Sequence, residues 1–260
     1  MKVNPTLTVI VILLVTICTT QAQRSSGVLG RRVSDKEAIA LNEQGVALIK
    51  AARYREAVEA FNRAIEFDPN YATAYNNLGM AYGQLEQPGK QMEALMQAVR
   101  LKPDYAEAHY NIGRRYSDEG RYREAVRSYQ LAISLRPDFA QAYNNLGVAY
   151  NNWGRPREAA MAYRQAIQLK PDYAEALNNL GTAQAEMGHY EDAVVSFQRA
   201  STLNPKLARA QFNLGVTYLR MKNREAALSQ HRLLLSFDPG FAAKLYGEIY
   251  QAKIINVATR

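Results

Sequence analysis

The sequence predicts an all-α solenoid of six repeated helix pairs with a C-terminal capping helix, and three observations lead to this prediction. Prolines recur every 34 residues, small residues recur in register with them, and apolar residues follow helical spacing through two segments of each repeat. The prolines are Pro69, Pro103, Pro137, Pro171, Pro205 and Pro239. A fixed period in this range is the sequence signature of a solenoid.

Residues 1–22 have the pattern of an export signal. A single positive charge, Lys2, precedes an apolar centre at residues 9–17, and small and polar residues follow. The apolar centre is shorter than the ~20 residues that a membrane span needs. We therefore predict a signal peptide cleaved before Gln23. An uncleaved signal anchor over residues 3–23 is the alternative, because this whole stretch lacks charge.

The single cysteine, Cys18, lies inside the predicted signal peptide. After cleavage the mature chain would hold no cysteine, which excludes an internal disulfide framework and a thiolate metal site. Lipid attachment at Cys18 would need a small residue before it, and Ile17 does not fit. We therefore do not expect a lipoprotein.

Residues 23–37 are predicted to form a linker and the start of the first helix. The linker is rich in serine, glycine and arginine and lacks apolar periodicity. Ser34 and Glu37 then have the spacing of a capping box, in which each side chain satisfies a free backbone amide at the helix start. The folded repeats are expected to follow at residue 38.

Small and large residues recur at fixed distances from the proline of each repeat. A glycine precedes each proline by 24 residues: Gly45, Gly79, Gly113, Gly147, Gly181 and Gly215. Alanine precedes it by 12 residues in all repeats except the second, which has Gln91. A large side chain precedes it by eight residues: Phe61, Leu95, Tyr129, Tyr163, Phe197 and His231. The small residues indicate close helix approach, and the large ones are expected to fill the volume between helices.

This pattern resembles the tetratricopeptide repeat family, most clearly in the segment Ala142–Tyr150 (AYNNLGVAY). The resemblance implies a right-handed α-solenoid of helix pairs. Its six repeats would occupy residues 38–71, 72–105, 106–139, 140–173, 174–207 and 208–241. An amphipathic segment follows, so residues 242–260 are predicted to form a capping helix and tail.

Composition and motifs give no support for catalysis or cofactor binding. The net charge of +8 and the 17 tyrosines could suggest nucleic-acid binding, but the charges are scattered and the tyrosines fall at packing positions. The three histidines form no catalytic or metal-binding motif. Recurring carboxylates lie near helix starts, where they complement the helix dipole. We expect no enzyme activity, no catalytic residue, no metal, no cofactor and no nucleic-acid partner.

The resemblance assigns the first helix of each pair to a concave binding groove. The sixth position of that helix is Glu43 in the first repeat and asparagine in the other five: Asn77, Asn111, Asn145, Asn179 and Asn213. The series is similar to the asparagine ladder in the superhelix of the O-linked N-acetylglucosamine transferase, whose catalytic domain has no counterpart here. A side-chain amide both donates and accepts hydrogen bonds, as a peptide backbone does. Alternatively, these asparagines hold neighbouring helices together. Arg114 adds a charge to the same groove.

These features predict an exported scaffold that binds a protein or an extended peptide in its groove. With helices ~8–10 Å apart and ~3.3–3.6 Å per extended residue, one asparagine would meet about every third ligand residue. The expected location is the periplasm, the cell envelope or the exterior. Membrane contact is expected only through an uncleaved anchor. The alternative function is a self-assembling architectural component of the envelope without a peptide ligand.

Overall fold

The computed structural model describes residues 35–258, with side chains described up to residue 250, and divides into two compact units between Asp104 and Tyr105. The N-terminal unit holds a helix at residues 35–50, α2 (Tyr54–Phe67), α3 (Ala72–Gln84) and α4 (Pro88–Leu101). The C-terminal unit holds α5 (Ala106–Asp118), α6 (Tyr122–Leu135), α7 (Ala140–Asn152), α8 (Pro156–Leu169), α9 (Ala174–Glu186), α10 (Tyr190–Leu203), α11 (Ala208–Arg220), α12 (Arg224–Leu235) and α13 (Pro239–Ala258). The predicted signal peptide, the linker and the expected cap residue Ser34 lie outside the described residues.

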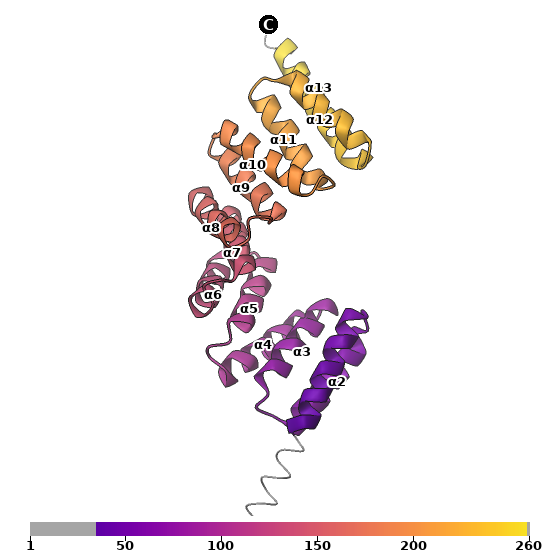
Figure 1. The fold of residues 1–260 in the computed structure, drawn as a ribbon, viewed down its shortest axis with the longest axis vertical. Helices are drawn as coiled ribbons and strands as arrows, with labels where there is room; N and C mark the ends of the chain where they lie inside the picture. Colours follow the sequence, from indigo (N-terminus) through magenta and orange to yellow (C-terminus); the bar gives the residue numbers. More distant parts are fainter. Residues whose placement is uncertain (1–34, 259–260) are drawn as a thin grey trace, which may run out of the picture. The chain divides into compact units, whose positions relative to one another are not determined.

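All regular structure within residues 35–258 is α-helical, and the helices pack as sequential pairs (Figure 1). The helix at residues 35–50 packs on α2, where Val46 and Ile49 contact the cluster around Phe61. The later pairs are α3 with α4, α5 with α6, α7 with α8, α9 with α10, and α11 with α12. The predicted fold class, six helix pairs followed by a capping helix, is confirmed. None of the described helices is long and apolar enough to cross a membrane.

The turn inside each helix pair uses one residue with left-handed backbone geometry. Glycine occupies this position in three pairs, with φ of +72°, +76° and +82° at Gly120, Gly154 and Gly188. In the other three pairs φ is +57°, +55° and +61° at Ala52, Glu86 and Lys222. A side chain in this conformation crowds the backbone, at a cost of about 1–2 kcal/mol. The glycine turns are therefore less strained than the other three.

The recurring glycine of each first helix makes room for the large side chain of its partner helix. A Cβ on Gly147 would lie 2.5 Å from Cε1 of Tyr163, and a Cβ on Gly181 would lie 2.7 Å from Cε1 of Phe197. Tyr163 and Phe197 are only 2% and 1% exposed. The sequence prediction attributed the small residues to close helix approach. The structure adds that a buried side chain lies directly against the glycine.

Gln91 replaces the recurring alanine of the second repeat and is accommodated by a further glycine. Its Nε2 lies 2.8 Å from the place where a Cβ on Gly83 would stand. The corresponding residue is Ser117 in the third repeat and Asn151 in the fourth. The longer side chain of Gln91 on α4 thus occupies the space that the absence of a side chain at Gly83 leaves on α3.

The capping helix supplies the packing residue that the last repeat lacks. A Cβ on Gly215 would lie 2.5 Å from Cδ2 of Leu245 on α13, whereas His231 lies beside Tyr246, with ring centroids 5.4 Å apart. Leu245 and Ile249 are buried against α11 and α12. The helix begins at Pro239, three residues before the expected boundary at residue 242. The predicted capping helix is confirmed, but His231 does not fill the core position that the pattern assigned to it.

Candidate binding face

The first helices of the four pairs in the C-terminal unit lie in contact one after another. α5 contacts α7, α7 contacts α9, and α9 contacts α11. Each carries one of the predicted asparagines, and we call the surface that Asn111, Asn145, Asn179 and Asn213 share the ladder face. Asn145, Asn179 and Asn213 are partly exposed, whereas Asn111 is buried, with 7% exposure. Asn77 on α3 in the N-terminal unit is also partly exposed.

The ladder asparagines join neighbouring first helices through their side-chain amides. Nδ2 of Asn179 donates to Oδ1 of Asn144, and Nδ2 of Asn213 donates to Oδ1 of Asn178, both at 3.0 Å. Nδ2 of Asn145 donates in the same way to the hydroxyl of Tyr110, at 2.9 Å. In the N-terminal unit Asn77 donates to Asn42 at 2.9 Å. The second interpretation of the asparagines, that they hold adjacent helices together, therefore has direct geometric support.

These bonds leave part of the Asn179 and Asn213 amides available on the ladder face. Oδ1 of Asn179 accepts from Nδ2 of Asn178 at 3.3 Å, so one N–H and one acceptor position remain unused. Asn213 differs because Phe212 precedes it and has no amide to donate. Within the described residues, Oδ1 of Asn213 accepts no hydrogen bond. Helix cohesion and ligand binding are therefore compatible roles for the same side chains.

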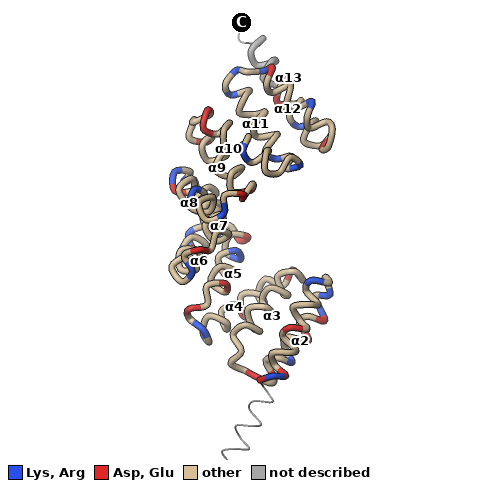
Figure 2. Tube along the Cα trace, in the orientation of Figure 1, with Lys and Arg blue, Asp and Glu red and all other residues tan. Residues whose placement is uncertain are grey.

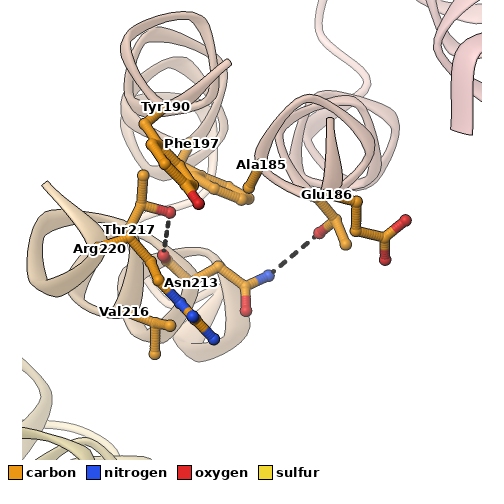
Figure 3. Close-up of a pocket in the computed structure, with 9 residues that line it drawn as sticks. Ala185, Glu186, Tyr190, Phe197, Asn213, Val216, Thr217 and Arg220 are labelled. Carbon is orange, nitrogen blue, oxygen red and sulfur yellow. Dashed lines mark hydrogen bonds between the residues drawn. The ribbon is translucent and has the colours of Figure 1, made fainter. Parts of the chain in front are cut away.

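A hollow of about 390 Å³ opens at the C-terminal end of the ladder face (Figure 3). It lies among α9, α10 and α11, with Phe197 as a buried aromatic wall and Asn213 on its edge. Its lining residues are Thr182, Ala185, Glu186, Tyr190, Phe197, Asn213, Val216, Thr217 and Arg220. This volume falls in the range of about 300–1,000 Å³ that is typical of ligand sites.

Sequence reasoning missed the hollow, although the sequence carries a signal for it. The twelfth position of the first helix is Asn151 in the fourth repeat and Leu219 in the sixth, but it is Ala185 in the fifth. A small residue between two larger ones leaves space at that repeat. The hollow also needs the placement of Phe197 and Arg220 from different helices, which the repeat pattern alone does not give.

Charges are distributed unevenly among the first helices of the C-terminal unit (Figure 2). α7 carries no charged residue, α9 carries Glu175 and Glu186, and α11 carries Arg209 and Arg220. These four residues are exposed and form no ion pair within the described part of the chain. The fifth and sixth repeats therefore present adjacent acidic and basic helices to solvent.

Arg114, the predicted charge of the groove, lies exposed on α5, one turn after Asn111. Burial raises the pKa of the Tyr110 phenol, whereas the nearby Arg114 guanidinium and the hydrogen bond from Asn145 lower it. The neighbouring Arg115 points elsewhere and pairs with Glu119 at 2.9 Å. Arg114 therefore leaves its charge free at the third repeat.

Comparison with protein-family models identifies the repeat. A model described as TPR repeat matches residues 45–86, 113–154 and 185–222. Models described as tetratricopeptide repeat match residues 72–105, 140–173, 162–195 and 208–241. The chain is a tetratricopeptide repeat (TPR) protein. Within the described residues of this TPR protein, no group of three or more histidine, cysteine or acidic side chains is placed to hold a metal ion.

Solved structures of other TPR proteins share the fold. PilF of Pseudomonas aeruginosa is 20% identical over 83% of this chain and 99% of its own, with a TM-score of 0.73. PilW, described as a type IV pilus biogenesis factor, is 20% identical over 80% of this chain and 98% of its own, with a TM-score of 0.74. YrrB, described as a TPR protein with an unusual peptide-binding site, is 25% identical over 73% of this chain and 99% of its own, with a TM-score of 0.61. A search of curated proteins finds no match.

Proposed function

We propose that this TPR protein is an exported scaffold that binds an extended segment of another protein along its ladder face. The observation that carries the proposal is the partial exposure of Asn145, Asn179 and Asn213 on successive helices, with hydrogen-bonding capacity left over. An extended peptide offers a backbone N–H and C=O at every residue, which amides at a regular spacing can match. The similarity to YrrB, whose description names a peptide-binding site, supports the same class of ligand.

A test must separate lost ligand contacts from lost helix cohesion, because the same amides do both. The ladder variant changes Asn179 and Asn213 to Ala and removes three inter-helix hydrogen bonds, to Asn144, Asn178 and Thr182, together with two exposed amides. The matched variant changes the acceptors Asn144 and Asn178 to Ala, which removes two of these bonds but keeps the exposed amides and the bond to Thr182. Each lost bond costs about 1 kcal/mol, and thermal melts measure the loss in both variants.

The assay is quantitative affinity capture from cell-envelope extract, with the unchanged chain and both variants as baits. The proposal expects a protein that the unchanged chain and the matched variant retain and that the ladder variant loses. Equal retention by all three baits would place the partner elsewhere on the surface. If nothing is captured and light scattering shows a defined oligomer, the architectural alternative becomes the better account.

The proposed export rests on the predicted signal peptide at residues 1–22. Mass spectrometry of the N-terminal peptide from the native host checks it directly. We expect the mature chain to begin at Gln23 and to fractionate with the periplasm, the envelope or the medium. A chain in the membrane fraction that retains residues 3–23 would support the signal anchor instead, and a cytoplasmic chain would refute export.

A further inference from the structure

The hollow between the fifth and sixth repeats has the composition of a subsite for one large apolar side chain. Phe197 lines it but is 1% exposed and fixed against Gly181, so it contributes almost no surface to solvent. The apolar surface that a guest can cover comes from the partly exposed Tyr190, Ala185 and Val216 (Figure 3). These side chains favour an apolar guest, because the guest removes apolar area from water on both partners.

The charge that faces this hollow is positive. Figure 3 shows the carboxylate of Glu186 directed away from the hollow and the guanidinium of Arg220 lying beside Asn213 and Val216. Glu186 already accepts a hydrogen bond from Nδ2 of Asn151 at 3.0 Å. Arg220 makes no ion pair within the described residues. A guanidinium at the rim binds a carboxylate through paired hydrogen bonds, which a neutral or basic guest cannot supply.

An open side-chain acceptor, Oδ1 of Asn213, stands next to both features. Oδ1 of Asn213 has no donor, and Asn213, Val216 and Arg220 lie on one face of α11 because they are spaced by three and four residues. A peptide N–H at the edge of the hollow could donate to this oxygen. The apolar wall, the acceptor and the cation therefore lie together on one surface.

We propose that this hollow selects the ligand of the ladder face: it takes a large apolar side chain of an extended peptide, and Arg220 binds an Asp or Glu side chain next to it. This inference rests on the proposed function and adds a sequence preference to it. Asn213 accepts the backbone N–H of the bound residue. The partner is thus a protein segment in which a bulky apolar residue has an acidic neighbour.

The test uses a phage-displayed library of random peptides, selected on the full chain and on three variants. Arg220→Glu reverses the charge at the rim, and Ala185→Phe fills the hollow. Arg199→Glu is the matched control, because Arg199 is exposed on α10 and does not line the hollow. The unchanged chain and the control should enrich peptides with an acidic residue beside a bulky apolar one.

The two site variants should change the selected sequences in different ways. Arg220→Glu should replace the acidic preference with a basic one, and Ala185→Phe should remove the apolar preference. With a synthetic amidated peptide chosen from the selection, Arg220→Ala should weaken binding about 2–5-fold, as expected for an exposed ion pair. A dependence on a free C-terminal carboxylate in place of the acidic side chain would overturn the assignment of Arg220.

The outcomes also separate this inference from the function on which it rests. If peptides are enriched and lost by the Asn179 and Asn213 ladder variant but respond to neither Arg220→Glu nor Ala185→Phe, the subsite is wrong and the ladder function stands. If the unchanged chain enriches no peptide above an empty support, both proposals fail.

Discussion

The close contact between Gly147 and Tyr163 gives a sharp prediction for the stability of the repeat. In Gly147→Ala the new Cβ would lie 2.5, 2.7 and 2.8 Å from three atoms of a ring that is 2% exposed. Overpacking of a buried site costs about 1–3 kcal/mol, and three contacts this short place the cost at the upper end. Alanine gains about 1 kcal/mol over glycine from helix propensity. We expect a net destabilisation of about 2 kcal/mol.

Urea unfolding followed by circular dichroism, together with hydrogen exchange of the α7 and α8 amides, measures this loss. Gly89→Ala on α4 is the matched control, since no atom outside its own turn of the helix lies within 4 Å of the added Cβ. It should be neutral or stabilising by up to about 1 kcal/mol. In a Tyr163→Val background, which lacks the ring, Gly147→Ala should itself become stabilising by a similar amount. If Gly147→Ala is as harmless as the control in the unchanged chain, the proposed reason for the glycine is refuted.

Three other predictions follow from the turns, the buried phenols and the cap. Lys222→Gly should raise the free energy of unfolding by about 1 kcal/mol, because φ at this position is +61°. Gly154→Ala, at φ +76°, should lower it by about the same amount, and thermal melts measure both changes. Burial raises the pKa of the Tyr163 phenol, so its contribution to the free energy of unfolding is fully present below about pH 10. Above that pH the unfolded chain loses the phenol proton first, and the free energy of unfolding decreases. Tyr163→Phe should make this decrease smaller in urea titrations at increasing pH. Leu245→Ala should cost about 2–5 kcal/mol and increase hydrogen exchange first in α11 and α12, and exchange that rises equally in α5 would contradict the nearest-neighbour reasoning.

Most of the fold follows from the sequence because each repeat gives the same signal several times. Proline, glycine and alanine at fixed spacing locate the helix ends and the close contacts, so helix pairing could be predicted without coordinates. The glycines at Gly120, Gly154 and Gly188 follow the same 34-residue period, and each lies in a turn with positive φ. A single departure such as Gln91 could be noticed but not interpreted, because its compensation by Gly83 lies on another helix.

The last repeat could be predicted less well because its environment is not repeated. In the first five repeats the large side chain of the second helix lies against the glycine of the first, but in the sixth the glycine contacts Leu245. The pattern assigned that role to His231, since the sequence position was equivalent. Equivalence of position predicts contacts only where the neighbour on each side is another repeat. At the end of the array the neighbour is α13, and the contact changes with it.

In the candidate site too, the repeated asparagines could be predicted from the sequence, whereas the features that occur in one repeat could not. The asparagine series was visible in the sequence, but its hydrogen bonds to Asn144 and Asn178 required the structure, because they join residues 35 positions apart. The repeated amides can serve any extended backbone, so they give affinity without much selectivity. Selectivity must come from positions that vary between repeats. Ala185 and Arg220 are such positions, and they line the same hollow as Asn213, whose Oδ1 receives no bond from the preceding residue, Phe212. A search for ligand preference should therefore begin at the fifth and sixth repeats.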